Sequence, residues 1–217
     1  MKSNRLILVL LCSVIIMFSC GKKQNSTGAK AGDSVSSSQV VQNVEPGKKF
    51  KIESGKIVIN SEMMGMKMKQ TFYFEDYGKK YLMETDMGFG KSIEFDKDGK
   101  HIRINETAKT INDKGSALDL ANQFMGFDFY SDYEKSKAKW SVLGTEEIAG
   151  KPCDKYSVDV PDYKTKGYYW IWKDTNIILK MDVDQNGNKI TWTAESAEPG
   201  VKIPAELMNI PAGYKEE

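Results

Sequence analysis

The 217-residue sequence is poor in the residues on which most catalytic and nucleic-acid-binding sites depend. It has one histidine, His101, and 31 basic residues against 30 acidic ones, which gives a formal net charge of +1. Binding to a phosphate backbone needs a concentrated basic face, so this balance argues against a nucleic-acid partner. His101 is expected on the polar side of a strand, with no acidic or nucleophilic companion in the sequence, which argues against a catalytic triad. We therefore expect a protein that is not an enzyme and has no cofactor.

The first 19 residues have the pattern of an export signal. Two basic residues precede an apolar run at residues 6–18, which is too short for a comfortable membrane span. The junction Ser19-Cys20-Gly21 resembles a bacterial lipoprotein signal, in which Cys20 becomes the diacylated first residue after cleavage. The alternatives are an ordinary signal peptide and a short anchor helix. Because Gly21 stands where an Asp resembles an inner-membrane retention signal, we expect a lipid anchor in the outer membrane, facing the periplasm.

Residues 20–48 have the composition of a flexible, lipidated tether, because they are rich in Gly, Ser, Lys and Gln and have no aromatic residue. Residues 49–217 then form a single domain, which is long enough to bury a core without disulfide bonds. Cys12 leaves with the leader and Cys20 is acylated, so Cys153 is the only thiol of the domain. An internal disulfide is therefore not expected, and Cys153 is predicted to be a small buried hydrophobe.

The sequence of the domain predicts antiparallel strands. Apolar residues alternate with polar ones in several runs, which is the period of a strand that is buried on one face. The turn sequences Asp76-Tyr77-Gly78, Asp98-Gly99 and Asn186-Gly187 separate such runs, and Asp-Gly and Asn-Gly supply the positive φ angles that tight hairpins require. The pattern predicts about ten strands. The alternating apolar residues are Met64, Met66, Met68, Phe72 and Phe74, then Ile102 and Ile104, then Ile177, Leu179, Met181 and Val183, and then Ile190, Trp192 and Ala194.

One segment has helical spacing instead. Residues 116–125, SALDLANQFM, place apolar residues at helical intervals, and Ser116 and Gly126 are suited to cap the two ends. The FDFYSDYEKSKAKW that follows is interpreted as a loop leading into a second short helix. The expected fold class is α+β and mostly β, with one or two helices inserted mid-chain and the helix covering the concave face of the sheet.

Several segments give a resemblance to a known family. They are the aromatic run Tyr169-Trp170-Ile171-Trp172, the run Ile178-Leu179-Lys180 that follows it, and the closing Ile210-Pro211-Ala212-Gly213-Tyr214. With a strand-rich first half and a mid-chain insertion, most of residues 50–217 resembles the LolA/LolB-like lipoprotein-carrier superfamily, including uncharacterised bacterial lipoproteins of that group. The resemblance implies a curved, antiparallel, half-open β-barrel that wraps over helices and holds acyl chains. It supplies no catalytic residue for this chain.

The stretch EMMGMKMKQT at residues 62–71 contains four of the eleven methionines. Thioethers are soft ligands that suit Cu(I), so a copper site is one interpretation. Met64, Met66 and Met68 nevertheless alternate in step with Phe72 and Phe74, and no histidine or cysteine lies nearby in the sequence. Core packing, a pliable ligand-facing wall and a copper site stay open as alternatives, and we expect copper to bind weakly or not at all.

A second candidate metal site is the segment 182–187, DVDQNG, which matches the opening of an EF-hand calcium loop. The closing bidentate Glu is missing from this pattern, because Thr193 stands at its position, and the flanking segments are predicted strands. We therefore interpret Asn186-Gly187 as a hairpin turn and predict no metal site there.

The leading hypothesis is a lipid-anchored module without chemistry that holds a hydrophobic ligand, an acyl chain or a lipoprotein tail, between the concave sheet and the predicted helix. One alternative is an envelope interaction or scaffold module whose barrel is filled by its own side chains, and another is a Met-rich copper-binding protein. The membrane is the expected partner through the N-terminal lipid, and the sequence does not indicate an oligomeric state. The candidate ligand-binding residues are Met64, Met66, Met68, Trp170 and Trp172 in the wall, and Phe127, Phe129 and Tyr130 in a lid.

Overall fold

The computed structural model describes residues 31–35, 40, 45–63, 65–116 and 137–217, which form one curved sheet of thirteen strands. The prediction of a mostly β fold is confirmed, whereas the expected number of about ten strands is wrong. Two of the additional strands, β1 (Ser34–Val35) and β13 (Lys215–Glu216), are too short for a periodic pattern to be read. The others are β2 (Gly55–Met63), β3 (Met66–Glu75), β4 (Lys80–Asp86), β5 (Lys91–Lys97), β6 (Lys100–Asn105), β7 (Thr110–Ser116), β8 (Lys139–Ile148), β9 (Lys151–Val160), β10 (Thr165–Trp172), β11 (Ile177–Gln185) and β12 (Asn188–Pro199).

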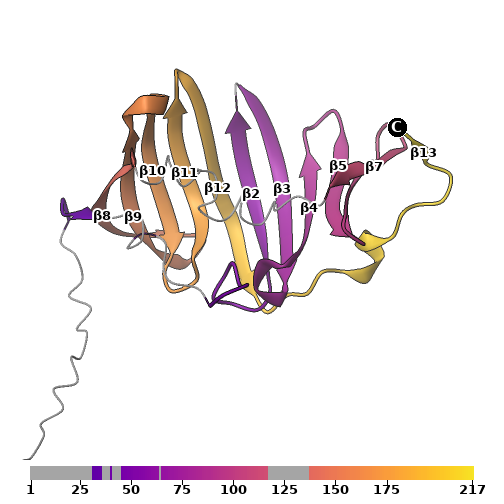
Figure 1. The fold of residues 1–217 in the computed structure, drawn as a ribbon, viewed down its shortest axis with the longest axis horizontal. Helices are drawn as coiled ribbons and strands as arrows, with labels where there is room; N and C mark the ends of the chain where they lie inside the picture. The colour runs from indigo at the N-terminus through magenta and orange to yellow at the C-terminus, as the bar shows by residue number, and fades with distance from the viewer. Residues whose placement is uncertain (1–30, 36–39, 41–44, 64, 117–136) are drawn as a thin grey trace, which may run out of the picture.

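The strand order across the sheet is β1-β8-β9-β10-β11-β12-β2-β3-β4-β5-β6-β7-β13 (Figure 1). Neighbouring strands are antiparallel, except that β13 pairs with β7 in parallel. After β1, which lies at one margin beside β8, the chain enters the middle of the sheet at β2 and runs outward to β7. It re-enters at the opposite end at β8 and returns to the middle at β12, which pairs with β2. The sheet therefore consists of two meanders that meet at the β12–β2 pair.

The helix expected at residues 116–125 begins at a residue that belongs to a strand. Ser116 ends β7, and residues 117–136 lie outside the described residues. The helical elements with bounds in the described ranges are three short 3-10 turns, and the expected helix lies outside those ranges except for Ser116. Within those ranges, no helix has the length and the hydropathy that a membrane span requires. The 3-10 turns are η1 (Asp76–Gly78), η3 (Pro161–Tyr163) and η4 (Ala205–Met208).

The three predicted turns are confirmed. Asp98-Gly99 joins β5 to β6 and Asn186-Gly187 joins β11 to β12, and all four residues have positive φ, from 52° to 85°. Positive φ at both central positions matches the right-handed twist of the flanking strands. The segment Asp76–Gly78 forms η1 between β3 and β4, also with positive φ throughout.

Cross-strand partners point to the same side of a sheet, so the register defines two faces. We call the inner face the one that carries Phe74, whose ring centroid lies 4.9 Å from that of Phe50, and the outer face the opposite one. A row of directly opposite residues runs along each face. The inner row is Met68, Ser61, Trp192, Met181 and Tyr169, and the outer row is Lys69, Asn60, Thr193, Lys180 and Trp170.

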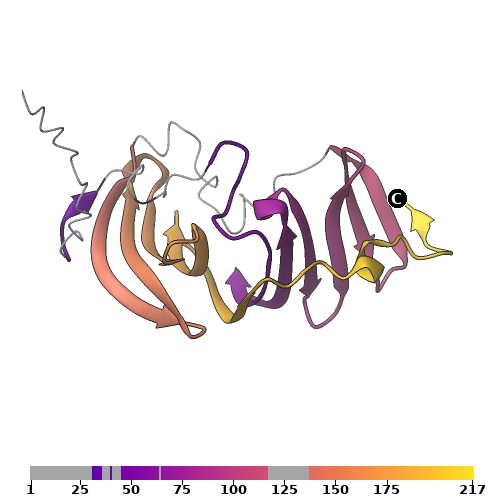
Figure 2. The same ribbon diagram turned by 90° about the horizontal axis from the view of Figure 1, so that it is seen from below.

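Each face is covered by a segment from outside the long strands. Residues 45–54 cross the inner face, where Lys51 N donates to Thr175 O at 3.0 Å and Lys49 N donates to Tyr77 O at 2.9 Å. Residues 200–214 cross the outer face of β3–β7, where Ile203 is buried against that part of the sheet. Figure 2 shows the first segment in indigo and the second in yellow on opposite sides of the sheet.

Candidate ligand-binding face

The inner face of β9–β12 and β2–β4 is apolar. Successive side chains of a strand point to opposite faces, and many of the large apolar ones point to this face. Directly opposite partners on neighbouring strands then form rows of side chains across the sheet. Two segments of these rows consist of buried side chains alone. One segment is Ile57, Phe72 and Met83, and the other is Trp192, Met181, Tyr169 and Tyr156.

Two side-chain hydrogen bonds interrupt this apolar surface between β2 and β4. Ser61 Oγ donates to Gln70 Oε1 at 3.0 Å, and Gln70 Nε2 donates to Met83 Sδ at 3.6 Å. Gln70 is buried, so these two bonds offset the cost of removing its amide from water. The methionine therefore acts both as apolar surface and as a weak hydrogen-bond acceptor.

At β5 and β6 the inner face carries a charged block, Glu94, Asp96, His101 and Arg103. Arg103 Nε donates to Glu94 Oε1 at 3.0 Å, and His101 Nδ1 lies 3.2 Å from Asp96 Oδ1. Only 8% of Glu94 and 7% of His101 are exposed. The interpretation of His101 as a surface histidine without an acidic companion is therefore wrong, because the Asp98-Gly99 turn folds β6 back onto β5 and places Asp96 opposite it.

Tyr81 joins the apolar rows to the charged block. Its ring stacks on Phe72 with centroids 6.4 Å apart, and its hydroxyl donates to Asp96 Oδ1 at 2.8 Å. Burial, followed by the hydrogen bond to Asp96, raises the pKa of Tyr81 well above its usual range. The phenol therefore stays protonated and keeps donating to the carboxylate at all physiological pH values.

The predicted wall residues do not share one face. Met68 is half-buried on the inner face, and Met66 is 49% exposed beside the turn of the β2–β3 hairpin. Trp170 lies on the outer face, in the row of Lys180 and Thr193. Trp172 is buried opposite Cys153, with Lys151 Nζ 5.3 Å from its ring centroid. The remaining candidates, Met64, Phe127, Phe129 and Tyr130, lie outside the described residues, as does Cys20.

Trp170 is held by polar partners on the outer face. Its Nε1 donates to Glu146 Oε2 at 2.6 Å, and the ammonium groups of Lys180 and Lys155 lie 4.2 and 4.8 Å from its ring centroid. The hydrogen bond from Lys155, followed by that from Trp170, lowers the pKa of Glu146. This arrangement buries an aromatic ring beneath charged side chains, and it accounts for Trp170 as a structural residue of the outer face.

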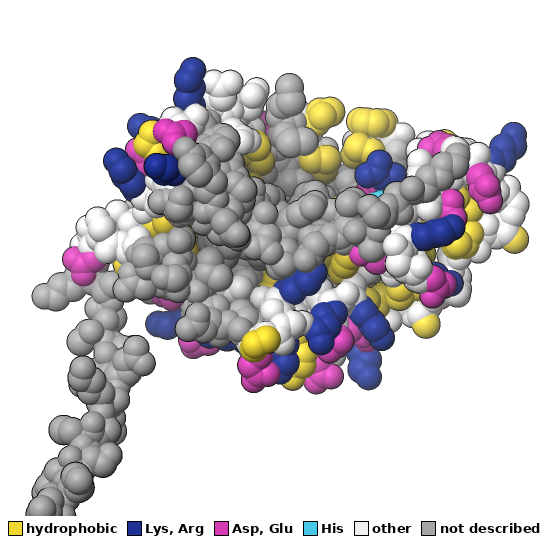
Figure 3. Space-filling view, in the orientation of Figure 1, with side chains coloured by type: hydrophobic (Ala, Val, Ile, Leu, Met, Phe, Trp, Pro, Cys, Tyr) yellow, Lys and Arg dark blue, Asp and Glu magenta, His cyan; other side chains and the backbone are white. Residues whose placement is uncertain are grey.

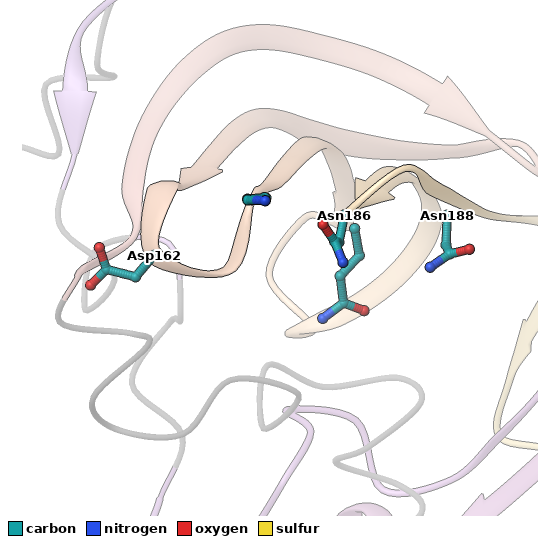
Figure 4. A pocket seen from close by; sticks show the side chains of 5 residues that line it. Asp162, Asn186 and Asn188 are labelled. Atoms are coloured by element: carbon teal, nitrogen blue, oxygen red, sulfur yellow. The ribbon is translucent and has the colours of Figure 1, made fainter.

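Two pockets among the described residues have polar linings. One of ≈ 430 Å³ lies between the turn at η3 and the β11–β12 turn, and Figure 4 shows Asp162 on the first turn and Asn186 and Asn188 on the second. Another of ≈ 480 Å³ follows β2, β3 and β12, where Asn60 and Thr193 of the outer face line it together with Met68. Neither has the apolar lining that is typical of an acyl-chain site. The charges on the visible face alternate in sign (Figure 3), in keeping with the near-zero net charge.

The residues considered for metal or thiol chemistry have structural environments. In the described ranges, no three His, Cys, Asp or Glu side chains are arranged to hold a metal ion. Asp184 Oδ1 accepts a hydrogen bond from Gly187 N at 2.8 Å, as part of the β11–β12 turn. Cys153 is fully buried, as predicted, and burial raises the pKa of its thiol to about 12. A thiol in this state is protonated at neutral pH and is a poor nucleophile.

No protein-family model and no curated protein matches this sequence. Solved structures do match it. A chain of the Pseudomonas aeruginosa MucA/MucB complex is 14% identical with a TM-score of 0.52, and the match covers 73% of this chain and 56% of that one. An uncharacterized conserved protein from Thermus thermophilus is 7% identical with a TM-score of 0.52, and the match covers 77% of this chain and 91% of that one. Identities this low show the fold alone, and the fold is that of the LolA/LolB-like group.

Proposed function

We propose that this chain is a lipid-anchored, non-enzymatic protein of the bacterial cell envelope that holds a hydrophobic ligand, an acyl chain or a lipoprotein tail, against its inner face. The observation that carries the proposal is the largely apolar inner face of seven strands, β9–β12 and β2–β4, which the contact between Ser61 and Gln70 interrupts. With strands ~4.8 Å apart, this face is ~29 Å wide, enough for an extended apolar chain. Each methylene that it removes from water contributes ~0.8 kcal/mol.

The composition of the face suits a ligand of variable shape. Met83 and Met181 lie within the rows, and unbranched thioether side chains adapt to irregular apolar surfaces. The titratable groups nearby favour ligand binding without catalysis. Both ring nitrogens of His101 face carboxylates, which accept hydrogen bonds and supply no activated hydroxyl or thiol.

A second candidate function is an envelope module that binds a protein partner, with the inner face filled by its own side chains. Phe50 favours it, because this fully buried ring packs against Phe74 and already occupies part of the inner face. The similar structure from P. aeruginosa is that of a complex, MucA/MucB, which is consistent with a protein partner for this fold.

Native mass spectrometry of the full chain, purified from membranes in a mild detergent, tests the proposal. A lipid adduct supports the holding of a ligand, and a bare mass supports the filled module. Ser61→Asp places a charge on the inner face beside Met68 and Trp192, so it should reduce the adduct several-fold. Asn60→Asp places the same charge on the outer face and should leave the adduct unchanged. Equal adducts in the two variants, with circular dichroism intact in both, would contradict a site on the inner face.

The lipid anchor is tested separately. Cys20→Ser removes the thiol that the lipoprotein signal requires, so the variant should accumulate as unprocessed precursor. Size and membrane fractionation of the two proteins give the readout. A processed Cys20→Ser chain that still fractionates with membranes would show that the leader is an ordinary signal or that another element attaches the chain.

A further inference from the structure

The polar pocket on the outer face has no role in the proposed function. This pocket of ≈ 480 Å³ lies on β12, β2 and β3, and its volume falls within the range of small-molecule sites. Most of its lining side chains point to the outer face and belong to two neighbouring rows of directly opposite residues, Thr193, Asn60 and Lys69 in one row and Thr191, Glu62 and Lys67 in the other. Ser61 and Met68, which lie between these residues along β2 and β3, complete the lining.

The charges around the pocket cancel. Glu62 stands directly opposite Lys67 in the β2–β3 pair, and Glu195 Oε2 lies 2.8 Å from Lys69 Nζ. The hydrogen bond from Lys69, followed by its charge, lowers the pKa of Glu195, so this carboxylate is ionised at neutral pH. Two carboxylates therefore face two ammonium groups, and this balance disfavours a ligand with a high charge of either sign.

Three other side chains of the pocket offer hydrogen bonds of both kinds. The hydroxyl groups of Thr191 and Thr193 each donate and accept, and the amide of Asn60 does the same. Asn60 and Thr193 are exposed and Thr191 is half-buried. Asn60 also hydrogen bonds to Glu195, which holds its amide in place. The matching ligand is uncharged and carries groups that donate and accept at close intervals, which is the chemistry of sugar hydroxyls.

One of the two rows leads from the pocket to an exposed aromatic ring. From Thr191 the row continues through Asp182 on β11 to Tyr168 on β10, which is 44% exposed. The ring centroid of Tyr168 lies 6.2 Å from that of Trp170 and 5.6 Å from Lys155 Nζ, so its neighbours fix its orientation. The face of an aromatic ring is negative, so the slightly positive C–H groups of a sugar stack on it. With strands ~4.8 Å apart, Tyr168 stands ~10 Å from Thr191, a distance that one oligosaccharide can span.

We propose that the outer face of β10–β12 and β2–β3 binds a linear, uncharged glycan, with one sugar unit in the pocket and another stacked on Tyr168. The site lies on the opposite face from the hydrophobic ligand, so it does not depend on the proposed function. A chain with both sites holds a hydrophobic ligand on one side of the sheet and a polysaccharide on the other.

An extended peptide is the competing occupant, and the position of the pocket disfavours it. A peptide strand gains its affinity from the free edge of a sheet or from apolar side-chain pockets. Here β12, β2 and β3 lie in the middle of the sheet and are paired on both sides, and the lining of the pocket is polar. Hydrogen bonds from side chains and one stacking ring are what this surface offers.

The test is a titration of the full chain with defined sugars, followed by isothermal titration calorimetry. The detergent is a polyoxyethylene ether, because an alkyl glycoside would compete for the site. The probes are the β-1,4-linked hexasaccharides of glucose and of N-acetylglucosamine, which are uncharged, and that of glucosamine, which is cationic. At least one uncharged probe should bind with a dissociation constant below ~1 mM, and the cationic probe should bind several-fold more weakly. No saturable binding of either uncharged probe would overturn the proposal, and so would a preference for the cationic one.

Three variants locate the site. Tyr168→Ala removes the stacking ring and should weaken the binding of the uncharged hexasaccharide by up to about tenfold. Thr191→Val keeps the shape of the side chain, removes one hydroxyl and should weaken the binding several-fold. Phe89→Ala is the matched control, because it removes another exposed ring, in the turn between β4 and β5, and should leave the binding unchanged.

The outcomes separate this inference from the proposed function. The lipid adduct in native mass spectrometry should be the same in Tyr168→Ala as in the wild-type chain, because the ring lies on the outer face. Unchanged glycan binding in both Tyr168→Ala and Thr191→Val, or an equal loss in Phe89→Ala, would overturn the assignment of the outer face and leave the proposed function standing.

Discussion

The β9–β12 part and the β5–β7 part of the sheet are apolar on opposite faces. In β9–β12 the inner face carries residues such as Met181 and Trp192, whereas the outer face carries Lys180. In β5–β7 the inner face carries the charged block, whereas the outer face carries the buried Phe95 and Ile102. Both parts are amphipathic, but in the opposite sense. Each apolar face has its own cover, residues 45–54 on the inside and residues 200–214 on the outside.

The reversal takes place in β3 and β4. Side chains of a strand alternate between the two faces, so consecutive buried residues mean that both faces are covered. Such triplets occur in each of these two strands, Phe72, Tyr73 and Phe74 in β3 and Tyr81, Leu82 and Met83 in β4, and their central residues belong to the outer core that contains Ile203. Consecutive buried residues also occur in β10, but there they pack in the inner core or, like Trp170, lie beneath lysine side chains. The difference between the two parts teaches that a long sheet can remain one folded unit while it exchanges its buried side, provided that the strands at the exchange are buried on both faces.

The largest expected effect compares outer-face aromatic residues of the two parts. Phe95→Ala removes a fully buried ring from the outer face of β5 and should lower the free energy of unfolding by ~3–5 kcal/mol. Tyr168→Ala removes a ring that is 44% exposed on β10 and should cost less than ~1 kcal/mol. Urea denaturation of both variants gives the comparison. Similar losses would mean that the two parts do not differ in which face is buried.

A smaller effect is expected from backbone crowding. A Cβ at position 167 in β10 would clash with Asp182 O and lie 2.6 Å from Val183 Cα, so Gly167→Ala forces the β10–β11 pair apart. The expected loss is ~1–3 kcal/mol in the free energy of unfolding, measured by denaturation. Gly90→Ala, where the nearest atom is Thr107 Oγ1 at 3.5 Å, is the control and should change stability by less than ~0.5 kcal/mol. A neutral Gly167→Ala would show that β10 has room against β11.

The polar character of the outer face in β9–β12 is tested at Trp170. Trp170→Phe keeps an aromatic ring of smaller size but removes the indole N–H and its 2.6 Å bond to Glu146, and loss of this bond should cost ~1 kcal/mol in the free energy of unfolding. The loss should largely vanish when the same substitution is made in a Glu146→Ala background, because the partner is already gone. Persistence of the full loss in that background would assign it to ring packing instead.

The smallest effect concerns Glu84, which shares the outer face with Ile93 in the β4–β5 pair. Burial, followed by repulsion from Glu106, raises its pKa above the ordinary value of 4.5. A raised pKa means that the folded state prefers the protonated acid, so stability is lost as the pH rises through the pKa of Glu84. Glu84→Gln should therefore stabilise the protein at pH 7 by a few tenths of a kcal/mol after solvent screening. The gain should disappear at acidic pH, and a gain independent of pH would point to another cause.

Much of this architecture could be predicted from local sequence. The Asp-Gly and Asn-Gly pairs fix two-residue turns, and the alternation in β3 and β11 fixes which residues share a side. The acidic companions of His101 were also within reach, because a two-residue turn at Asp98-Gly99 places Asp96 opposite it. The order of residues does not show them directly, because residues that lie opposite each other across a turn are not adjacent in the sequence.

The side chosen by Trp170 could not be predicted in this way. It stands between Tyr169 and Ile171, so apolar residues occupy both parities and the period of two does not decide. The decision comes from the register with β9 and β11, which places Lys155 and Lys180 beside it. Hydrophobic composition therefore identified a strand buried on both faces, and only its long-range pairing tells which side chain lines which face.

The two-residue strands at the margins have a consequence for self-association. An open sheet presents a row of unpaired N–H and C=O groups at each margin, which invites further chains to add strands and grow into fibrils. Here β1 pairs with β8 at one margin and β13, with Lys215 and Glu216, pairs with β7 at the other. Such short, partly charged edge strands oppose further strand addition, because they present few backbone hydrogen-bonding groups to an incoming chain. Loss of β1 or β13 should leave the core folded and yet favour polymerisation through the exposed edge of β8 or β7.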